Sequence, residues 1–282
     1  MSLYMRFPGG LAKALTLSYD DGVETDIRLI EIMQKNGLLG TFNLNTGLYA
    51  PEGTVYPAGQ AARRMSRSQI EKCYKGTGME VAVHGRSHTY LDRDPVTKCA
   101  YQIVKDREDL EEMFGVIVRG MAYPFGTYND DVIRIARDCG IVYSRTTRAT
   151  HGFDMPQEPL KLDPTCHHAD EQLMPLLDRF LKEDRLRIRN PWMFYLWGHS
   201  YEFDAADNWN VIKDFCRAAG GHEDVWYATN IQIIEYRMAF KQLVLSVNGD
   251  YVYNPTNTTL WMCTPGGDPR SCAPGERIFI GA

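Results

Sequence analysis

Short apolar runs alternate along the chain with segments whose apolar residues recur at helical spacing. Short runs of this kind are typical of strands. The predicted strands cover residues 14–19, 41–45, 80–84, 141–144, 192–197 and 225–229, and one more is expected between 116 and 123. The helical spacing predicts helices at residues 26–35, 66–74, 95–114, 130–139, 170–181, 209–219 and 231–240.

Local signals mark several helix ends. Gly37 and Gly140 follow their helical segments and are predicted C-caps. Ser68 and Glu71 have the spacing of a capping box in the second helix. Pro175 is expected to kink or break the helix at 170–181.

The repeated order of strand and helix predicts an α/β fold with parallel strands and helices outside, either a barrel or an open doubly wound sheet. About seven strands over roughly 240 residues favour the barrel. In such barrels the catalytic groups lie at the carboxyl ends of the strands. The predicted strands place five polar residues there: Asp20, Asp21, His84, Tyr123 and His199.

The last forty residues have a different pattern. Short β-strands are predicted at residues 243–247, 251–253, 259–263 and 277–280. Asn248-Gly249 between two of these runs is a hairpin signal. We therefore divide the chain into a barrel at 1–240 and a small β-rich C-terminal extension at 241–282 that packs on the barrel.

The composition, with 44% apolar and 24% charged residues, is that of an ordinary globular protein. The net charge of −5 without a basic run argues against nucleic acid, and no stretch approaches the ~20 apolar residues that span a bilayer. Residues 1–6 lack a signal-peptide pattern, so we expect a cytoplasmic protein, or a chain from which a signal was removed. The seven dispersed cysteines fit reduced thiols, with Cys263 and Cys272 as candidates for a disulfide in an oxidising compartment.

Carboxylates and histidines follow the predicted strands. Asp20 and Asp21 are adjacent at a strand end, so they point to different sides and can act separately on a metal and a water, or can cap the next helix. His84 and His88 meet on one helical turn or in a tight loop, where two imidazoles and a carboxylate suit zinc with open positions for water. Surface histidines are the alternative. His199 follows a very apolar strand, as expected at a barrel mouth or for a histidine satisfied by a loop hydrogen bond.

The order of four segments resembles the polysaccharide deacetylases, carbohydrate esterase family four, which share the chitooligosaccharide-deacetylase homology domain. The segments are Asp20-Asp21, His84-x-x-x-His88, Tyr123-Pro124-Phe125-Gly126 and His199. The resemblance covers residues 12–235. It implies a distorted (β/α)7–8 barrel and an enzyme that removes acyl groups, usually N-acetyl, from sugars.

The resemblance also implies roles for individual residues. Asp20 corresponds to the family's catalytic base and His199 to its general acid. The backbone N–H of Phe125 corresponds to the donor that faces the oxyanion. The metal triad corresponds to Asp21, His84 and His88. The expected cofactor is a divalent metal, with zinc first and cobalt, nickel or manganese as alternatives.

The chain departs from the family pattern at two supports. The family usually has an arginine two residues before the proline, against the base, where this chain has Ala122. Arg86 and Arg145 are the candidates to supply that charge. The usual Asp-Trp segment that supports the acid is also absent, and Asp163 or Glu202 could orient His199 instead.

Several residues are weaker candidates for substrate contact. Asn43, at the end of the second strand, and Arg86 could bind substrate, and Tyr123 and Trp197 could form a wall on which a sugar stacks. Strand-end turns and core packing are the alternatives. The histidines of the long loop are expected at the surface, namely His151, His167 and His168.

The leading hypothesis is thus a metal-dependent hydrolase that acts on a carbohydrate or a small acylated substrate. The alternatives are an amidohydrolase with a non-sugar C–N substrate, a catalytically silent carbohydrate-binding barrel, and a scaffolding role for the C-terminal strands. The sequence leaves the oligomeric state open.

Overall fold

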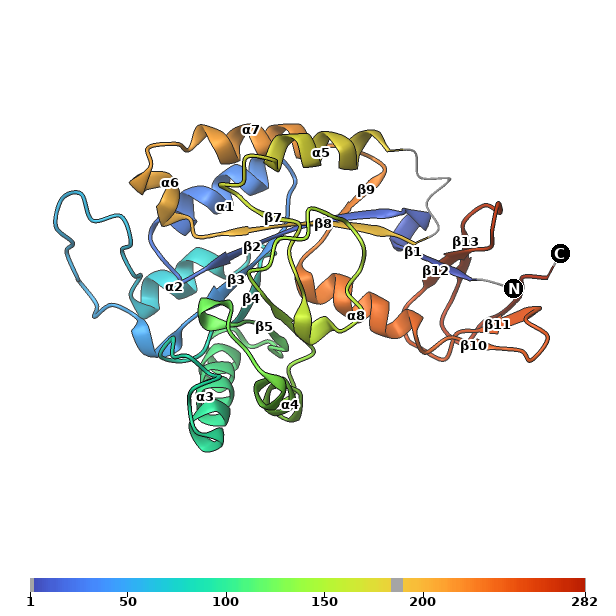
Figure 1. Cartoon of the computed structure of the whole chain (residues 1–282), viewed down its shortest axis with the longest axis horizontal. Coiled ribbons are helices and arrows are strands. Elements are labelled where there is room, and N and C mark those ends of the chain that lie inside the picture. The colour runs from blue at the N-terminus through green and yellow to red at the C-terminus, as the bar shows by residue number, and fades with distance from the viewer. Residues whose placement is uncertain (1–2, 184–189, 282) are drawn as a thin grey trace.

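The computed structural model describes residues 3–183 and 190–281 (Figure 1). Its centre is an eight-stranded sheet in the order β6-β5-β4-β3-β2-β8-β7, with β9 paired to β2, and all its strand pairs are parallel. The strands are β2 (Lys13–Asp20), β3 (Gly40–Leu44), β4 (Glu80–Val83), β5 (Gly120–Ala122), β6 (Tyr143–Arg145), β7 (Cys166–His167), β8 (Trp192–Gly198) and β9 (Val225–Tyr227).

Helices surround this sheet, and α1, α3, α4, α5 and α7 all contribute to one hydrophobic core with its strands. In Figure 1, α1, α5, α6 and α7 group along the top, and α3 and α4 lie at the bottom. The helices are α1 (Thr25–Lys35), α2 (Arg67–Tyr74), α3 (Val96–Phe114), α4 (Asp130–Asp138), α5 (Leu173–Lys182), α6 (Tyr201–Ala205), α7 (Asn210–Ala219) and α8 (Asn230–Phe240).

The sheet curls around its own inner face. β2 is the central strand. Its residues 13–19 pair with β8 along one edge. Along the other edge, its residues 13–15 pair with β9 and its residues 17–20 pair with β3. Arg145 on β6 nevertheless contacts Asp20 on β2, although three strands separate β6 from β2. The predicted distorted (β/α) barrel is therefore confirmed, with β6 and β7 at the two ends of the strand order.

The C-terminal strands form two small antiparallel sheets, β10 (Val244–Leu245) with β11 (Tyr251–Tyr253) and β14 (Arg277–Phe279), and β12 (Leu260–Cys263) with β13 (Arg270–Cys272). The hairpin at Asn248-Gly249 is confirmed by the pairing of β10 with β11. The second sheet also takes in β1 (Tyr4–Arg6), which pairs with β12 (Figure 1). The sequence pattern missed β1 and β13, and the division at 240/241 stays a prediction.

Two local predictions need correction. The capping box of α2 is Ser66 with Gln69, because the Ser66 hydroxyl accepts from the Gln69 backbone N–H and the Gln69 side chain accepts from that of Ser66. Pro175 breaks nothing, since it lies in the first turn of α5, where no intrahelical N–H bond is lost. The strand expected between residues 116 and 123 is confirmed as β5.

The short elements β7 and α6 also escaped the sequence pattern, because two to five residues are too few to show a period. Every cysteine is free, so the candidate pair of Cys263 and Cys272 is not bridged. Within residues 3–183 and 190–281, none of the helices has both the length and the apolar character needed to cross a bilayer.

Asp26 is a fully buried carboxyl group that ties three elements together. It accepts hydrogen bonds from the hydroxyl groups of Tyr74 on α2 and Ser200 next to His199, and from the backbone N–H of Val23. Burial raises the pKa of Asp26 from 3.8 to about 7, because the three hydrogen bonds offset the loss of hydration only in part.

This raised pKa predicts a pH-dependent loss of stability. The folded state holds the proton more tightly than the unfolded chain, so the contribution of Asp26 is full below about pH 4 and is lost as the pH rises through about 7. We expect Asp26→Asn to lose less stability than the wild type between pH 5 and pH 8 in urea unfolding. Glu31→Gln, an exposed position on α1, is the matched control and should behave as the wild type. Equal pH dependence in all three proteins would contradict the assignment.

Candidate active site and metal centre

A cavity of about 330 Å³ opens at the carboxyl ends of β2, β5 and β8. Nine of the residues singled out in the sequence line it, namely Asp20, Asp21, His84, His88, Tyr123, Phe125, Arg145, Trp197 and His199. Gly126, Thr147 and Tyr201 complete the wall. The curl of the sheet therefore brings five segments of the sequence to one place.

Asp21, His84 and His88 form the group with the donor set of a metal site. One ligand-type atom of each lies within 4.8 Å of the others. Two positive φ angles make this possible: 89° at Asp21 and 50° at His88, which follows Gly85 in a tight loop. The loop, not a helical turn, is thus the way in which the two histidines meet.

The protonation of the two imidazoles suits a cation. His84 Nδ1 lies 2.9 Å from the carbonyl of Ala122 and donates to it, so Nε2 keeps its lone pair for the site. Burial lowers the pKa of His84, and burial followed by the nearby His84 lowers the pKa of His88 to about 4. Two neutral imidazoles and one carboxylate fit a borderline divalent metal such as zinc.

Asp20 lies beside this group and is almost fully buried. Its carboxylate accepts from Asn43 Nδ2 at 2.8 Å and from Arg145 Nη2, and it lies 3.6 Å from His84 Nε2. Burial alone would raise the pKa of Asp20, but Arg145, His84 and His199 lower it to about 2. Asp20 is therefore ionised at neutral pH and can accept a proton.

Arg145 supplies the charge that the family places at the position of Ala122. Ala122 on β5 and Arg145 on β6 are paired residues in register, so the guanidinium comes from the neighbouring strand. Arg145 is 1% exposed, and its guanidinium carbon lies 4.3 Å from the centre of the Trp197 ring. Of the two candidates named from the sequence, Arg86 is the wrong one: it does not line the cavity, and its Nε lies 3.4 Å from Asp109.

Glu202 on α6 orients His199. Its Oε1 lies 3.2 Å from His199 Nδ1, which leaves Nε2 facing Asp20 at 3.8 Å. Burial would lower the pKa of His199, but the bond to Glu202 and the charge of Asp20 raise it above its ordinary value. Asp163, the other candidate, instead accepts from Thr146 and Arg148.

Two of the weaker predictions are corrected. Asn43 is fully buried, and its amide donates to Ser18 and Asp20, so it holds the carboxylate and is closed to substrate. Arg86 lies outside the cavity lining. Tyr123 and Trp197 do reach the cavity wall, although Tyr123 is 1% exposed and its hydroxyl donates to the Leu160 carbonyl.

His168 is not a surface residue, contrary to prediction, since it is 3% exposed. Its Nε2 and that of His167 lie 2.9 and 3.2 Å from Glu202 Oε2, a second grouping of ligand-type atoms. His167 Nδ1 accepts from the backbone N–H of Ala169, so the proton of neutral His167 sits on Nε2. His167 therefore faces Glu202 as a donor, which does not suit a metal ligand.

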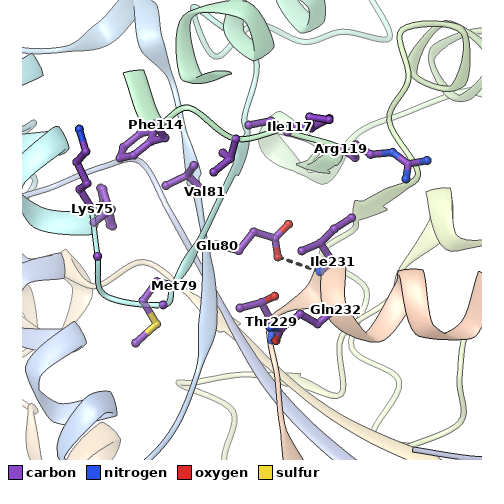
Figure 2. A pocket seen from close by; sticks show the side chains of 15 residues that line it. Lys75, Met79, Glu80, Val81, Phe114, Ile117, Arg119, Thr229, Ile231 and Gln232 are labelled. Carbon is purple, nitrogen blue, oxygen red and sulfur yellow. Dashed lines mark hydrogen bonds between the residues drawn. The ribbon is translucent and has the colours of Figure 1, made fainter. Parts of the chain in front are cut away.

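Another cavity, of about 300 Å³, lies beside the start of β4 and of α8 (Figure 2). Its walls are mainly apolar, with Val81, Phe114 and Ile117 among them. The carboxyl group of Glu80 accepts hydrogen bonds from the hydroxyl groups of Tyr143 and Thr41 and from the backbone N–H of Ile231. The bond from Ile231 is the dashed line in Figure 2. Glu80 therefore offers this cavity no free carboxyl group.

Sequence comparison identifies one family that this chain resembles. The profile described as Polysaccharide deacetylase matches residues 9–144, the segment that contains Asp20, Asp21, His84 and His88. This part of the chain is therefore similar to the polysaccharide deacetylase family. No match was found among curated proteins.

Three solved structures illustrate the similarity. A Streptococcus pyogenes deacetylase with acetate is 22% identical over 52% of this chain and 61% of its own, with a TM-score of 0.44. A family 4 carbohydrate esterase from Streptomyces lividans with acetate is 14% identical over 74% of this chain and 87% of its own, with a TM-score of 0.47. A family 4 pseudoenzyme from Bacillus anthracis is 18% identical over 82% of this chain and 68% of its own, with a TM-score of 0.48. The chain spans less than two thirds of the first of these proteins.

Two residues of the site had no signal in the sequence. Tyr201 lines the cavity from the start of α6, an element too short to predict. Arg64 forms an ion pair with Asp21 at 2.8 Å but comes from an irregular segment without a motif. Glu202 lies three residues after His199, so its spacing on one helical turn was the signal for it.

Proposed function

We propose that this protein is a member of the polysaccharide deacetylase family and a metal-dependent hydrolase that removes acyl groups, with N-acetyl as the expected group, from a carbohydrate. The observation that carries the proposal is the convergence of Asp20, the Asp21–His84–His88 group and His199 on one cavity. Zinc is the metal that this donor set fits best, with cobalt, nickel and manganese as alternatives.

The side chains divide the work. The ionised Asp20 would take the proton of the attacking water, and Arg145 and Asn43 hold it in place for that step. The backbone N–H of Phe125, at the cavity wall, would donate to the oxyanion that develops on the acyl carbon. His199, whose pKa is raised by its bond to Glu202, would give its proton to the leaving amine.

A cation held by Asp21, His84 and His88 would, when bound, lower the pKa of water and polarise the acyl carbonyl. Trp197 and Tyr201 lie on the cavity wall and would limit which sugars enter. An amide of a non-sugar substrate would meet the same groups, so the substrate class must be decided by experiment.

The test is acetate release from a panel of N-acetylated sugars and from small non-sugar amides. We expect release from the sugars with zinc, no release after chelation, and recovery on adding zinc back. Release only from the non-sugar amides would favour the amidohydrolase alternative. Sugar binding without release at any metal would overturn the proposal in favour of a silent carbohydrate-binding barrel.

A further inference from the structure

Arg64 lies at the end of the long loop that follows η2 (Thr46–Leu48) and leads into α2, at the left of Figure 1. The last residues of this loop run antiparallel to the segment after β2, with a bridge between Val23 and Arg64 and a bond from the Met65 N–H to the Gly22 carbonyl. The pairing brings the Arg64 side chain to Asp21.

Arg64 holds Asp21 at two points. Its Nη2 donates to Asp21 Oδ1 at 2.8 Å, and its Nη1 donates to the backbone carbonyl of Asp21. A planar guanidinium can bridge two acceptors in this way, whereas a lysine ammonium is a single point of charge. The clamp therefore fixes both the backbone and the side chain of one residue.

Asp21 needs such a clamp, because its φ of 89° lies in the left-handed region that residues with a Cβ avoid. Backbone conformations of this kind are unfavourable and persist only where surrounding contacts fix them. The clamp on the Asp21 carbonyl and the bond from the Asp21 N–H to the Asn43 carbonyl are those contacts.

The same guanidinium also reaches the loop that carries the histidines. Arg64 Nη1 donates to Asn45 Oδ1 at 2.8 Å. Asn45 is 1% exposed, and its Nδ2 donates to the backbone carbonyls of His84 and Gly85 at 2.7 and 2.8 Å. Arg64 and Asn45 thus connect the turn of Asp21 with the loop that begins at His84.

We propose that Arg64 is a positioning residue, which through Asp21 and Asn45 sets the spacing of the three candidate metal ligands and so the affinity for the cation. This proposal rests on the proposed metal centre. Partners of metal-ligating side chains of this kind change metal affinity by about 10–100-fold when they are removed. Arg64 itself carries a positive charge. If it merely competed with the metal for Asp21, its removal would strengthen metal binding instead of weakening it.

The test measures zinc affinity by competition with a chromophoric chelator, without substrate, in Arg64→Lys, Arg64→Ala and Asn45→Ala. We expect about 10–100-fold weaker zinc binding in all three. Arg64→Lys keeps the charge and loses the two-point clamp, so it separates positioning from charge. Arg63→Ala is the matched control: the neighbouring arginine of the same loop pairs with Glu24 and Asp204, and we expect unchanged zinc affinity.

Tighter zinc binding in Arg64→Lys and Arg64→Ala would overturn the proposal and make Arg64 a competitor of the cation. Equal weakening in Arg63→Ala and Arg64→Ala would overturn it as well, because it would assign the effect to the loop as a whole. Urea unfolding of the zinc-free proteins identifies any variant that fails to fold. If Arg64→Ala fails to fold, the milder substitution Arg64→Lys carries the test. Absence of zinc binding in the wild type would contradict the proposed metal-dependent function, and this result is distinct from a change of affinity in the variants.

Discussion

Asp20→Asn is expected to abolish acyl hydrolysis while zinc stays bound. The amide cannot accept the proton of the attacking water, and loss of a positioned base costs about 10²–10⁴-fold in rate. The three candidate ligands are other residues, so the zinc affinity of the variant should be near that of the wild type. Turnover of an acetylated sugar and zinc titration of the same preparation check the two halves of this prediction.

The control for Asp20→Asn is Asp163→Asn, which removes a carboxylate that contacts Thr146 and Arg148 outside the cavity lining. We expect Asp163→Asn to keep its activity. Turnover by Asp20→Asn at the wild-type rate would rule out Asp20 as the base. Loss of zinc together with activity would instead show that Asp20 serves as a metal ligand.

Arg145→Ala is expected to lower both stability and turnover. The Arg145–Asp20 pair is buried, with side chains 1% and 2% exposed, and removing one partner of a buried pair costs about 3–5 kcal/mol because the other charge is left alone. Without Arg145, burial raises the pKa of Asp20 and less of it is ionised at neutral pH. Urea unfolding and the rate of acetate release measure the two effects.

The paired positions allow a sharper form of this experiment. Ala122 is the register partner of Arg145 and lies on β5, which is one strand nearer to the Asp20 strand than β6 is. In an Arg145→Ala background, an arginine at position 122 would therefore occupy the space of the missing side chain. We expect Ala122→Arg combined with Arg145→Ala to recover part of the lost turnover, whereas Ala122→Arg alone overfills the buried wall. A double variant no better than Arg145→Ala would refute the idea that the two positions are equivalent.

The sequence predicted the parts of this protein that depend on short-range pattern. The alternation of apolar runs and helical segments indicated parallel strands, and the curled parallel sheet confirms it. The adjacent aspartates and the His84–His88 spacing lie within single loops, so the sequence alone placed them near one another. Asn248-Gly249 marked its hairpin for the same reason, since the whole connection lies within a few consecutive residues.

The supports of the site were beyond the sequence, because they join residues that only the curl of the sheet brings together. Arg145 reaches Asp20 across three intervening strands, and the sequence pattern could name it only as one of two candidates, together with Arg86. Arg64 meets Asp21 from an irregular loop with no period or motif. Asn43 was predicted to contact substrate, but the tertiary packing buries it against Asp20.

The chain by itself thus determined which residue types stand at the strand ends, since strand and loop are local properties of the sequence. The tertiary structure alone decided their partners and protonation. Burial and neighbouring charges set these, and both arise only when distant segments pack together.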